Sequence, residues 1–393
     1  MGRSGAGGPG PLPPGMRALL TLVGAVVFID TALYAALAPI LADLRDEFGL
    51  GKAGAGVLAG AYPAGTVLGA LPGGWLTARY GARIVITGAL ITMSVASAAF
   101  ALAHGIVAID AARFLQGLGG AATWTAGLAW VAQLAPSERR GELLGIAIGL
   151  AIFGAQFGPV IGTIADAAGR EATFLAMAAV GLPLILVARA MAAPPVAVAT
   201  GRSPRRLAAD RPFLAGVWLT VLASLAFGVI EVLVPLRLDA LGASALAIGA
   251  AFFVSGGVEA AMSPLVGRIS DRSGVAVVVR RATLLAAGGL AVLALPSQAI
   301  VLAALLAITA AGLGALWVPG NNLASVAAER LHVDQGWAFS VNSLAWAGGV
   351  AIGALAGGVL AGAVGDGLAY GLAGLLMLAT ALVATRSPKA FDG

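Results

Sequence analysis

The chain has 393 residues, of which 60% are hydrophobic and only 10% are charged, and its formal net charge is +5. Soluble domains carry about a quarter charged residues, so this composition, with a mean hydropathy of +0.97, excludes an ordinary soluble protein. The absence of cysteine excludes disulfides, thiolate nucleophiles and cysteine-ligated metals. We therefore expect an all-α protein that crosses the membrane many times and needs no cofactor or metal.

The first 17 residues are rich in glycine and proline and lack an apolar core of their own. This composition predicts a disordered tail, residues 1–17, rather than a signal peptide.

Twelve apolar segments of helix length follow. Six are expected at about 18–41, 53–77, 84–103, 106–133, 142–165 and 172–191. Six more are expected at about 213–236, 244–266, 277–295, 298–327, 337–361 and 368–385. The long polar connection over 192–212 divides the chain into two six-helix bundles, 18–191 and 213–385, and a tail covers 386–393.

The basic residues predict the orientation, because cytoplasmic loops are enriched in Lys and Arg. With a cytoplasmic amino terminus, all but five of the 23 basic residues fall on the cytoplasmic side. The exceptions are Arg45, Lys52, Arg113, Arg170 and Arg237. Both termini are therefore expected in the cytoplasm, and the net charge does not indicate nucleic-acid binding.

Asp30 interrupts the first apolar segment in "FIDTALYAALAPIL". A carboxylate at bilayer depth costs at least about 2.5 kcal/mol, so such residues usually serve a function. Asp30 is therefore expected to carry the coupled proton.

The two halves share a loop pattern, since "GGWLTARYGAR" (73–83) resembles "VGRISDRSGVA" (266–276). Three residues recur 193 positions later: Gly74, Arg79 and Gly81 correspond to Gly267, Arg272 and Gly274. A twofold repeat of six helices is typical of secondary transporters.

These loops resemble the G-x-x-x-D-R-x-G-R-R signature of the major facilitator superfamily, although Ala78 replaces the acid in the first copy. The resemblance implies a charged cytoplasmic latch, for which ordinary positive-inside charge is an alternative explanation. Its expected members are Arg79, Arg83, Arg139, Arg140, Asp271 and Arg272.

The fourth segment contains "ARFLQGLGG", which resembles the R-x-x-Q-G motif of the same family through Arg113 and Gln116. A buried arginine should face a cavity and find a carboxylate. Asp30 is the expected partner in proton coupling, and a static pair with Asp110 is the alternative.

The fifth segment resembles the pattern G-x8-G-x3-G-P-x2-G-G, which in this superfamily marks antiporters, mainly drug:proton exporters, although Thr163 replaces the last glycine. The matching residues are Gly145, Gly154, Gly158, Pro159 and Gly162. Glycines at this spacing predict close packing on another helix, expected in the opposite half. General small-residue packing is the alternative.

Other polar and aromatic residues are candidates for a substrate cavity, although each could equally be a packing residue. They are Tyr34, Gln116, Trp124, Gln156, Glu231, Asn321, Asn322, Asn342 and Trp346. Glu231 lies near the outer end of its segment, a shallow position that favours contact with the outer interface. Glu259 lies deep in its segment and is a second candidate for proton coupling.

The sequence predicts no enzyme, because it has no nucleotide-binding loop and no hydrolase motif at membrane depth. We expect a monomeric, proton-coupled antiporter in the plasma (inner) membrane that exports small lipophilic or cationic compounds by alternating access. A uniporter or importer of a small metabolite on the same fold is the alternative.

Overall fold

The computed structural model describes residues 12–136, 139–192, 204–333 and 335–391, and within these ranges every regular element is a helix. The first half comprises α1 (Pro14–Ala35), α2 (Leu37–Glu47), α3 (Lys52–Tyr80), α4 (Ala82–Leu102), α5 (Ile106–Leu134), α6 (Arg140–Ala168) and α7 (Arg170–Ala190). The second comprises α8 (Arg211–Ala240), α9 (Ala245–Ser273), α10 (Val275–Val292), α11 (Ala299–Gly314), α12 (Trp317–Arg330), α13 (Gln335–Ala363) and α14 (Asp366–Arg386). Short 3₁₀ turns, η2 (Pro204–Ala209) and η3 (Pro388–Phe391), flank the second half.

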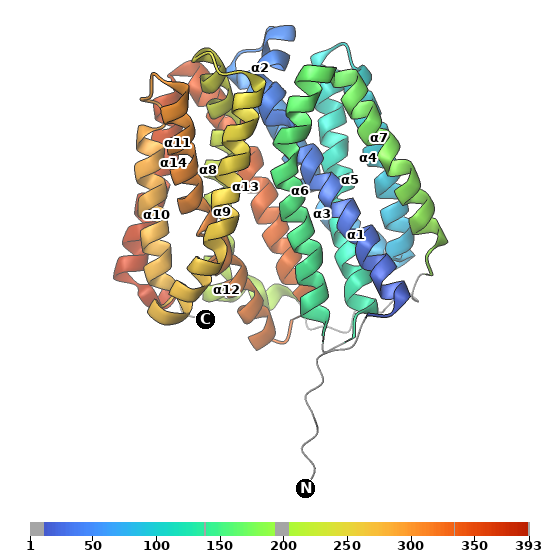
Figure 1. Cartoon of the computed structure of the whole chain (residues 1–393). Helices are drawn as coiled ribbons and strands as arrows, with labels where there is room; N and C mark the ends of the chain where they lie inside the picture. Colours follow the sequence, from blue (N-terminus) through green and yellow to red (C-terminus); the bar gives the residue numbers. More distant parts are fainter. Residues whose placement is uncertain (1–11, 137–138, 193–203, 334, 392–393) are drawn as a thin grey trace.

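The two halves form two bundles that lie side by side (Figure 1). Helix α1 begins and α14 ends at the lower end of the view, which we call the terminal end, and α2 lies at the opposite α2 end (Figure 1). Part of the expected linker, residues 193–203, lies outside the described residues. The predicted all-α, two-bundle fold class is confirmed.

Eleven spans in the described ranges are long and apolar enough to cross a membrane. The expected fourth span is present as α5, 29 residues long, but it is not among the eleven. Glycine, tryptophan and glutamine in α5 lower its hydropathy, and they include residues of the site described below. The length of α5 and its place in the bundle indicate that this helix also crosses the membrane.

Two of the expected spans are each divided into two helices by a break. Helix α1 ends at Ala35 and α2 starts at Leu37, while α11 and α12 are separated by residues 315–316. Pro39 and Pro319 follow these breaks. A proline lacks the N–H that would bond to the carbonyl four residues earlier, and its ring crowds that carbonyl, so the helix bends or breaks there.

The repeated loops form the same corner in both halves. Gly81 joins α3 to α4 with φ +84° and ψ 152°, and Gly274 joins α9 to α10 with φ +84° and ψ 153°. The N–H of each glycine bonds to the carbonyl four residues earlier, on Thr77 and Ser270. Because residues with a side chain rarely adopt this φ, glycine is required at both corners.

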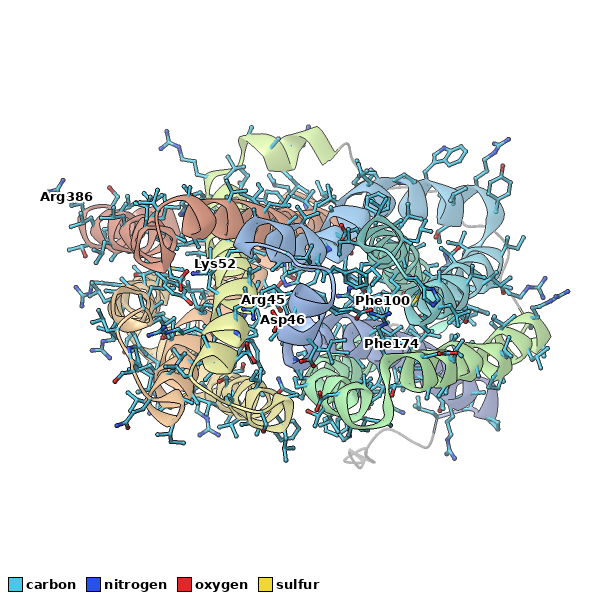
Figure 2. The ribbon with its side chains drawn as sticks, turned by 90° about the horizontal axis from the view of Figure 1, so that it is seen from above. Arg45, Asp46, Lys52, Phe100, Phe174 and Arg386 are labelled. Atoms are coloured by element: carbon cyan, nitrogen blue, oxygen red, sulfur yellow. The ribbon has the colours of Figure 1, made fainter. Side chains whose placement is uncertain are left out.

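The halves meet at the α2 end. Arg45 of α2 contacts Asp239 of α8 at 3.3 Å, and Lys52 of α3 pairs with Asp366 of α14. Figure 2, seen from that end, shows Arg45, Asp46 and Lys52 near the middle of the molecule. Just below, Gly56 of α3 lies against the α13 backbone, a close approach that small residues permit between membrane helices.

Packing within the first half is tight at the same end. The rings of Phe100 (α4) and Phe174 (α7) are 4.5 Å apart between centroids, and both side chains are buried; Figure 2 labels them on the first-half side. Many large apolar side chains elsewhere are exposed on the helix surfaces, as expected for helices that face lipid.

Candidate functional site

Asp30 lies in the second half of α1, five residues before its end at Ala35, with only 2% of its surface exposed. Two donors from neighbouring helices satisfy its carboxylate. The Tyr62 hydroxyl of α3 donates to Oδ1, and the Trp124 indole Nε1 of α5 donates to Oδ2 at 2.9 Å. Gly120 of α5 leaves room for this arrangement, because a methyl group there would overlap Oδ1. Burial of the carboxylate is thus offset by hydrogen bonds rather than by an ion pair.

Arg113 of α5 is 1% exposed and binds the backbone of α1 near its end. Its Nη1 donates to the Leu33 carbonyl at 2.8 Å, and its Nη2 donates to the Tyr34 carbonyl at 3.0 Å. These carbonyls directly precede the break after Ala35, where a helix leaves acceptors that its own N–H groups do not use. The guanidinium also stacks over the Tyr62 ring at 5.1 Å, a cation–π contact.

Arg113 forms an ion pair with neither of its predicted partners in the described part of the chain. Its remaining hydrogen bond goes to Gln116 Oε1 at 3.0 Å, and Gln116 in turn donates to the Ser97 hydroxyl at 3.1 Å. The static pair with Asp110 is therefore wrong for this structure, where Asp110 Oδ1 has no hydrogen-bond partner. Backbone carbonyls take the place of a carboxylate, an outcome that spacing alone could not indicate.

Tyr34 links this network to the second half. Its hydroxyl donates to Glu231 Oε2 of α8 at 2.5 Å, and its ring contacts Trp346 of α13 at 5.3 Å and Tyr62 at 5.2 Å between centroids. Glu231 thus lies between the halves, so its assignment to the outer interface is wrong. Tyr34 accepts from Arg113 through its carbonyl and donates to Glu231 through its hydroxyl.

We call this group the central network. It consists of Asp30, Tyr34, Tyr62, Arg113, Gln116, Trp124, Glu231 and Trp346. It contains two carboxyl groups and one guanidinium. A low-dielectric interior strongly favours a balanced charge, so one carboxylate matches Arg113 and the second needs a proton or an external cation.

Glu259 lies apart from the central network, in α9. It faces the break between α11 and α12, where a methyl group on Gly314 would come 2.9 Å from its carboxyl carbon. The Trp317 side chain hydrogen-bonds to it, and the Ser263 hydroxyl bonds to its backbone carbonyl at 3.3 Å. A proton-coupling role for Glu259 would therefore involve the broken helix and not Arg113.

The remaining cavity candidates are scattered. Asn342 of α13 accepts from Thr220 and donates to Asn321, both at 2.6 Å. Asn322 is exposed at the surface of α12. Gln156 of α6 lies against Gly256 of α9, at the contact between the halves. The structure does not bring these residues into the central network.

Sequence reasoning missed Tyr62, which contacts three members of the central network: Asp30, Tyr34 and Arg113. Tyr62 belongs to no family motif and has no charged residue beside it in the sequence. A tyrosine inside an apolar segment, before Pro63, looks like an ordinary packing residue. Only the crossing of α1 and α3 brings its hydroxyl to Asp30.

The glycine pattern of α6 packs inside its own half. Gly154, Gly158 and Gly162 lie against α1 and the start of α2, and a methyl group on Gly158 would come 2.7 Å from the Ala35 carbonyl carbon. Pro159 and Thr163 instead face Gly249 of α9. The expected contact of the glycine strip with the opposite half is therefore wrong. A methyl group added to Gly145 would have no neighbouring atom within 4 Å. Gly145 therefore takes no part in the close packing.

The latch remains a prediction, because the side chains of Arg140 and Asp271 lie outside the described residues. Arg83 Nη1 donates to the Met191 carbonyl at 3.2 Å, Arg139 pairs with Glu142 at 2.7 Å, and Arg79 stacks on Tyr80 at 5.8 Å. These contacts, and the exposed Arg272, do not connect the two halves.

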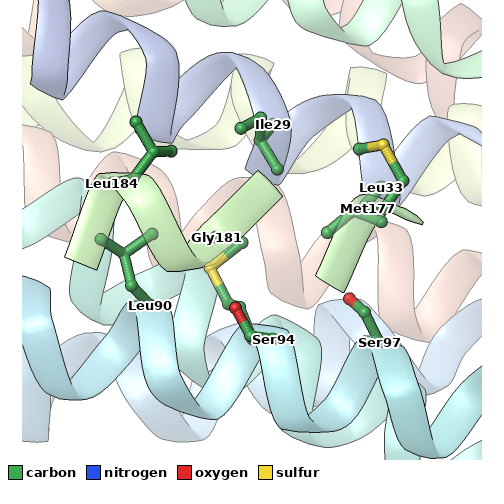
Figure 3. Close-up of a pocket in the computed structure, with 9 residues that line it drawn as sticks. Ile29, Leu33, Leu90, Ser94, Ser97, Met177, Gly181 and Leu184 are labelled. Carbon is green, nitrogen blue, oxygen red and sulfur yellow. The ribbon is translucent and has the colours of Figure 1, made fainter. Parts of the chain in front are cut away.

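A small pocket lies inside the first half, among α1, α4 and α7 (Figure 3). Figure 3 shows Ile29 and Leu33 on one side and Leu90, Ser94 and Ser97 on the other. No charged residue lines it. We interpret it as a packing cavity beside the Gln116–Ser97 bond rather than a substrate site.

Known proteins resemble this chain in sequence and fold. An MFS-type transporter, ppzB, of Metarhizium rileyi is 30% identical over 192 residues, 48% of this chain and 40% of that protein. A probable vesicular acetylcholine transporter-B of Danio rerio is 34% identical over 42% of this chain and 36% of its own length. The hexuronate transporter of Bacillus subtilis is 27% identical over 42% and 38%. The matches thus span less than half the length of these relatives.

Solved transporters share the fold over nearly the whole chain. A bacterial homologue of the human lysosomal transporter Spinster, inward-facing and unoccupied, superimposes with a TM-score of 0.72 at 15% identity and covers 97% of both chains. A D-xylose-proton symporter gives 0.72 at 18% identity, over 94% of this chain and 97% of its own. The sequence model of the Major Facilitator Superfamily matches residues 20–236 and 216–390. This integral membrane protein therefore belongs to the Major Facilitator Superfamily of transporters.

Proposed function

We propose that the chain is a proton-coupled antiporter that exports small lipophilic cations by alternating access. The observation that carries the proposal is the charge balance of the central network, with Asp30 and Glu231 opposite a single Arg113. A proton or a cationic substrate can supply the missing positive charge, but the two together would leave an excess. Competition between them for the carboxylates couples their movements.

The aromatic residues of the network suit such a substrate. The Tyr34 ring contacts the Tyr62 ring in a tilted arrangement and the Trp346 ring edge-on, beside Glu231. Aromatic faces attract organic cations, most strongly where water is excluded. The lipophilic part of the substrate would contact these rings while its charged group replaces the proton.

The Tyr34–Glu231 bond would change during transport. Alternating access moves one bundle relative to the other around a central site. Asp30, Tyr62, Trp124 and Arg113 all belong to the first half and would move together. The bond to Glu231 joins the halves, so it would break and re-form in each cycle.

The remaining assignments are part of the same proposal. The terminal end would face the cytoplasm of a plasma (inner) membrane, as the distribution of basic residues predicts. The protein would act as a monomer. Glu259 would serve as a second proton acceptor at the break between α11 and α12.

Uphill transport in proteoliposomes tests the proposal. We expect wild-type protein to drive accumulation of a fluorescent lipophilic cation, such as ethidium, against its gradient when a pH gradient is imposed. Asp30→Asn should abolish this accumulation while leaving expression intact, because the neutral amide is cheaper to bury.

Asp110→Asn is the matched control. Asp110 is, like Asp30, an aspartate within a long helix of the first half, but it lies outside the central network. It should keep accumulation near the wild-type level. Undiminished uphill transport by Asp30→Asn would remove Asp30 from the coupling mechanism.

One observation favours the alternative, import of a small metabolite. Arg113 is a buried cation that could receive a carboxylate, and the hexuronate transporter is among the relatives. Its Nη1 and Nη2 already donate to α1 carbonyls and Gln116, and its buried Nε has no partner in the described part of the chain, so we place this function second. Counterflow of a labelled sugar acid, without effect of the pH gradient, would favour it.

A further inference from the structure

We propose that a groove between α10 and α14 binds an anionic phospholipid from the bilayer leaflet at the terminal end. The groove has a volume of about 350 Å³. It is lined by Arg280 and Leu284 of α10 and by Leu378, Ala381, Leu382 and Thr385 of α14. It lies in the second half, on helices that carry no member of the central network.

The packing of the two helices accounts for the groove. Gly374 of α14 faces α10. A Cβ atom added to Gly374 would lie 3.7 Å from the Ala287 carbonyl oxygen and 3.8 Å from Leu290 Cβ. Toward the terminal end, Ala381 of α14 is buried, whereas Leu284, Leu378 and Leu382 are partly exposed. These leucines and the small side chain of Ala381 line the groove. Figure 1 shows α10 and α14 together at the edge of the molecule, where lipid can reach them.

The lining residues match the two parts of a phospholipid. Leu284, Leu378 and Leu382 are 48, 41 and 56% exposed, so they offer an apolar surface to an acyl chain. Arg280 lies in the second turn of α10, near the terminal end. An arginine in this position extends its head group toward the interface, where phosphate groups lie.

The guanidinium of Arg280 makes no hydrogen bond or ion pair within the part of the chain that the structure describes, whereas its backbone carbonyl accepts from the Thr283 hydroxyl. Arg281 and Arg386 add positive charge at the same end, and both are exposed. Helix α10 contains no acidic residue, and the acid of α14, Asp366, pairs with Lys52 at the α2 end. A lipid phosphate or an anionic head group is therefore the complementary ligand.

The experiment compares lipid retention by variants of the full-length protein. Protein is reconstituted in nanodiscs of equimolar phosphatidylglycerol and phosphatidylcholine, extracted in mild detergent, and examined by native mass spectrometry. We expect one retained phosphatidylglycerol per wild-type chain. Arg280→Gln should weaken retention about tenfold, because a charge-assisted contact is lost.

Two further variants separate a site from general attraction. Arg281→Gln removes an adjacent, exposed positive charge that does not line the groove, so retention should stay at the wild-type level. Leu382→Trp fills the groove without changing charge and should reduce retention as strongly as Arg280→Gln. Their melting temperatures, measured in phosphatidylcholine alone, confirm that the variants are folded.

Equal loss in Arg280→Gln and Arg281→Gln would indicate diffuse electrostatic attraction and overturn the proposal. Equal retention of phosphatidylglycerol and phosphatidylcholine by the wild type would overturn it too. Neither result depends on transport, so the lipid site and the proposed antiport function can fail independently.

Discussion

The two acids of the central network, one from each half of the protein, are held in different ways. In the first half, Asp30 accepts from two side chains, and the neighbouring Arg113 is fixed to two backbone carbonyls and a glutamine. In the second half, Glu231 has a single donor, and that donor, Tyr34, belongs to the first half. The difference suggests that the first half carries a rigid, preorganised site and that the second half approaches and leaves it.

The rigidity of the first half should depend most on the packing of α6 against α1. Gly158→Val would force a side chain against α1, because a Cβ atom at Gly158 would lie 2.9 Å from the Ala32 carbonyl oxygen and 2.7 Å from the Ala35 carbonyl carbon. Overpacking of this kind costs about 1–3 kcal/mol and shifts the backbone. Because α1 carries Asp30, we expect substrate binding and transport to fall together, by more than tenfold, measured as equilibrium binding and uptake.

Gly145→Val is the matched control in the same helix, since a Cβ at Gly145 has no neighbour within 4 Å. It should behave as wild type. If Gly158→Val bound substrate normally and lost only coupling, the glycine strip would act between the halves after all.

The comparison also predicts a difference in stability. Arg113→Gln should lower the melting temperature by several degrees, because hydrogen bonds to charged groups are each worth about 1.5–3 kcal/mol and two α1 carbonyls lose their donor. Glu231→Gln should change the melting temperature by less than about one degree, since an amide can still accept from Tyr34. If Arg113→Gln and Glu231→Gln lowered the melting temperature equally in a thermal unfolding assay, the bonds of the two residues would contribute equally to stability, contrary to this prediction.

Tyr34→Phe tests the link between the halves. The substitution removes the hydroxyl that bonds to Glu231 but keeps the ring contacts with Tyr62 and Trp346. We expect about a tenfold fall in transport rate, consistent with a net loss of up to about 1.5 kcal/mol for one hydrogen bond. Melting temperature should fall by less than in Arg113→Gln, because only one hydrogen bond is lost. An unaffected rate would mean that the bond plays no part in the cycle.

The smallest effect is expected at the α2 end. Lys52 is 37% exposed and pairs with Asp366, which is 18% exposed. A partly exposed pair contributes about 0–1 kcal/mol. Lys52→Gln should therefore only modestly raise the labelling rate of an engineered cysteine between the halves at this end. High salt should have the same effect on the protein that keeps Lys52. No change under either condition would show that the apolar α3–α13 contact closes this end alone.

Much of the fold follows from the sequence, for physical reasons that particular residues illustrate. Apolar segments bounded by charge or glycine predict the helices, and Gly81 and Gly274 mark matching corners because the backbone there has a positive φ. The breaks near Pro39 and Pro319 were not predicted, although each proline removes a backbone donor. Their exact outcome depends on neighbouring helices.

The candidate site was predictable only in part. Asp30 and Arg113 stand out because charge inside an apolar segment is costly. Their partners do not, since Tyr62 and the Leu33 carbonyl have no signature of their own. The same limit applies to the α6 glycines, whose spacing indicates a close contact but not whether α1 or the opposite half provides it.

The proposed antiport requires competition between a proton and a cationic substrate for the central network. Proton release from purified protein in weakly buffered detergent solution, followed with a pH indicator while a lipophilic cation is added, tests this without transport. We expect about one proton to be released per bound cation by wild type and Asp110→Asn, and none by Asp30→Asn. Cation binding by the wild type without release of protons would contradict it.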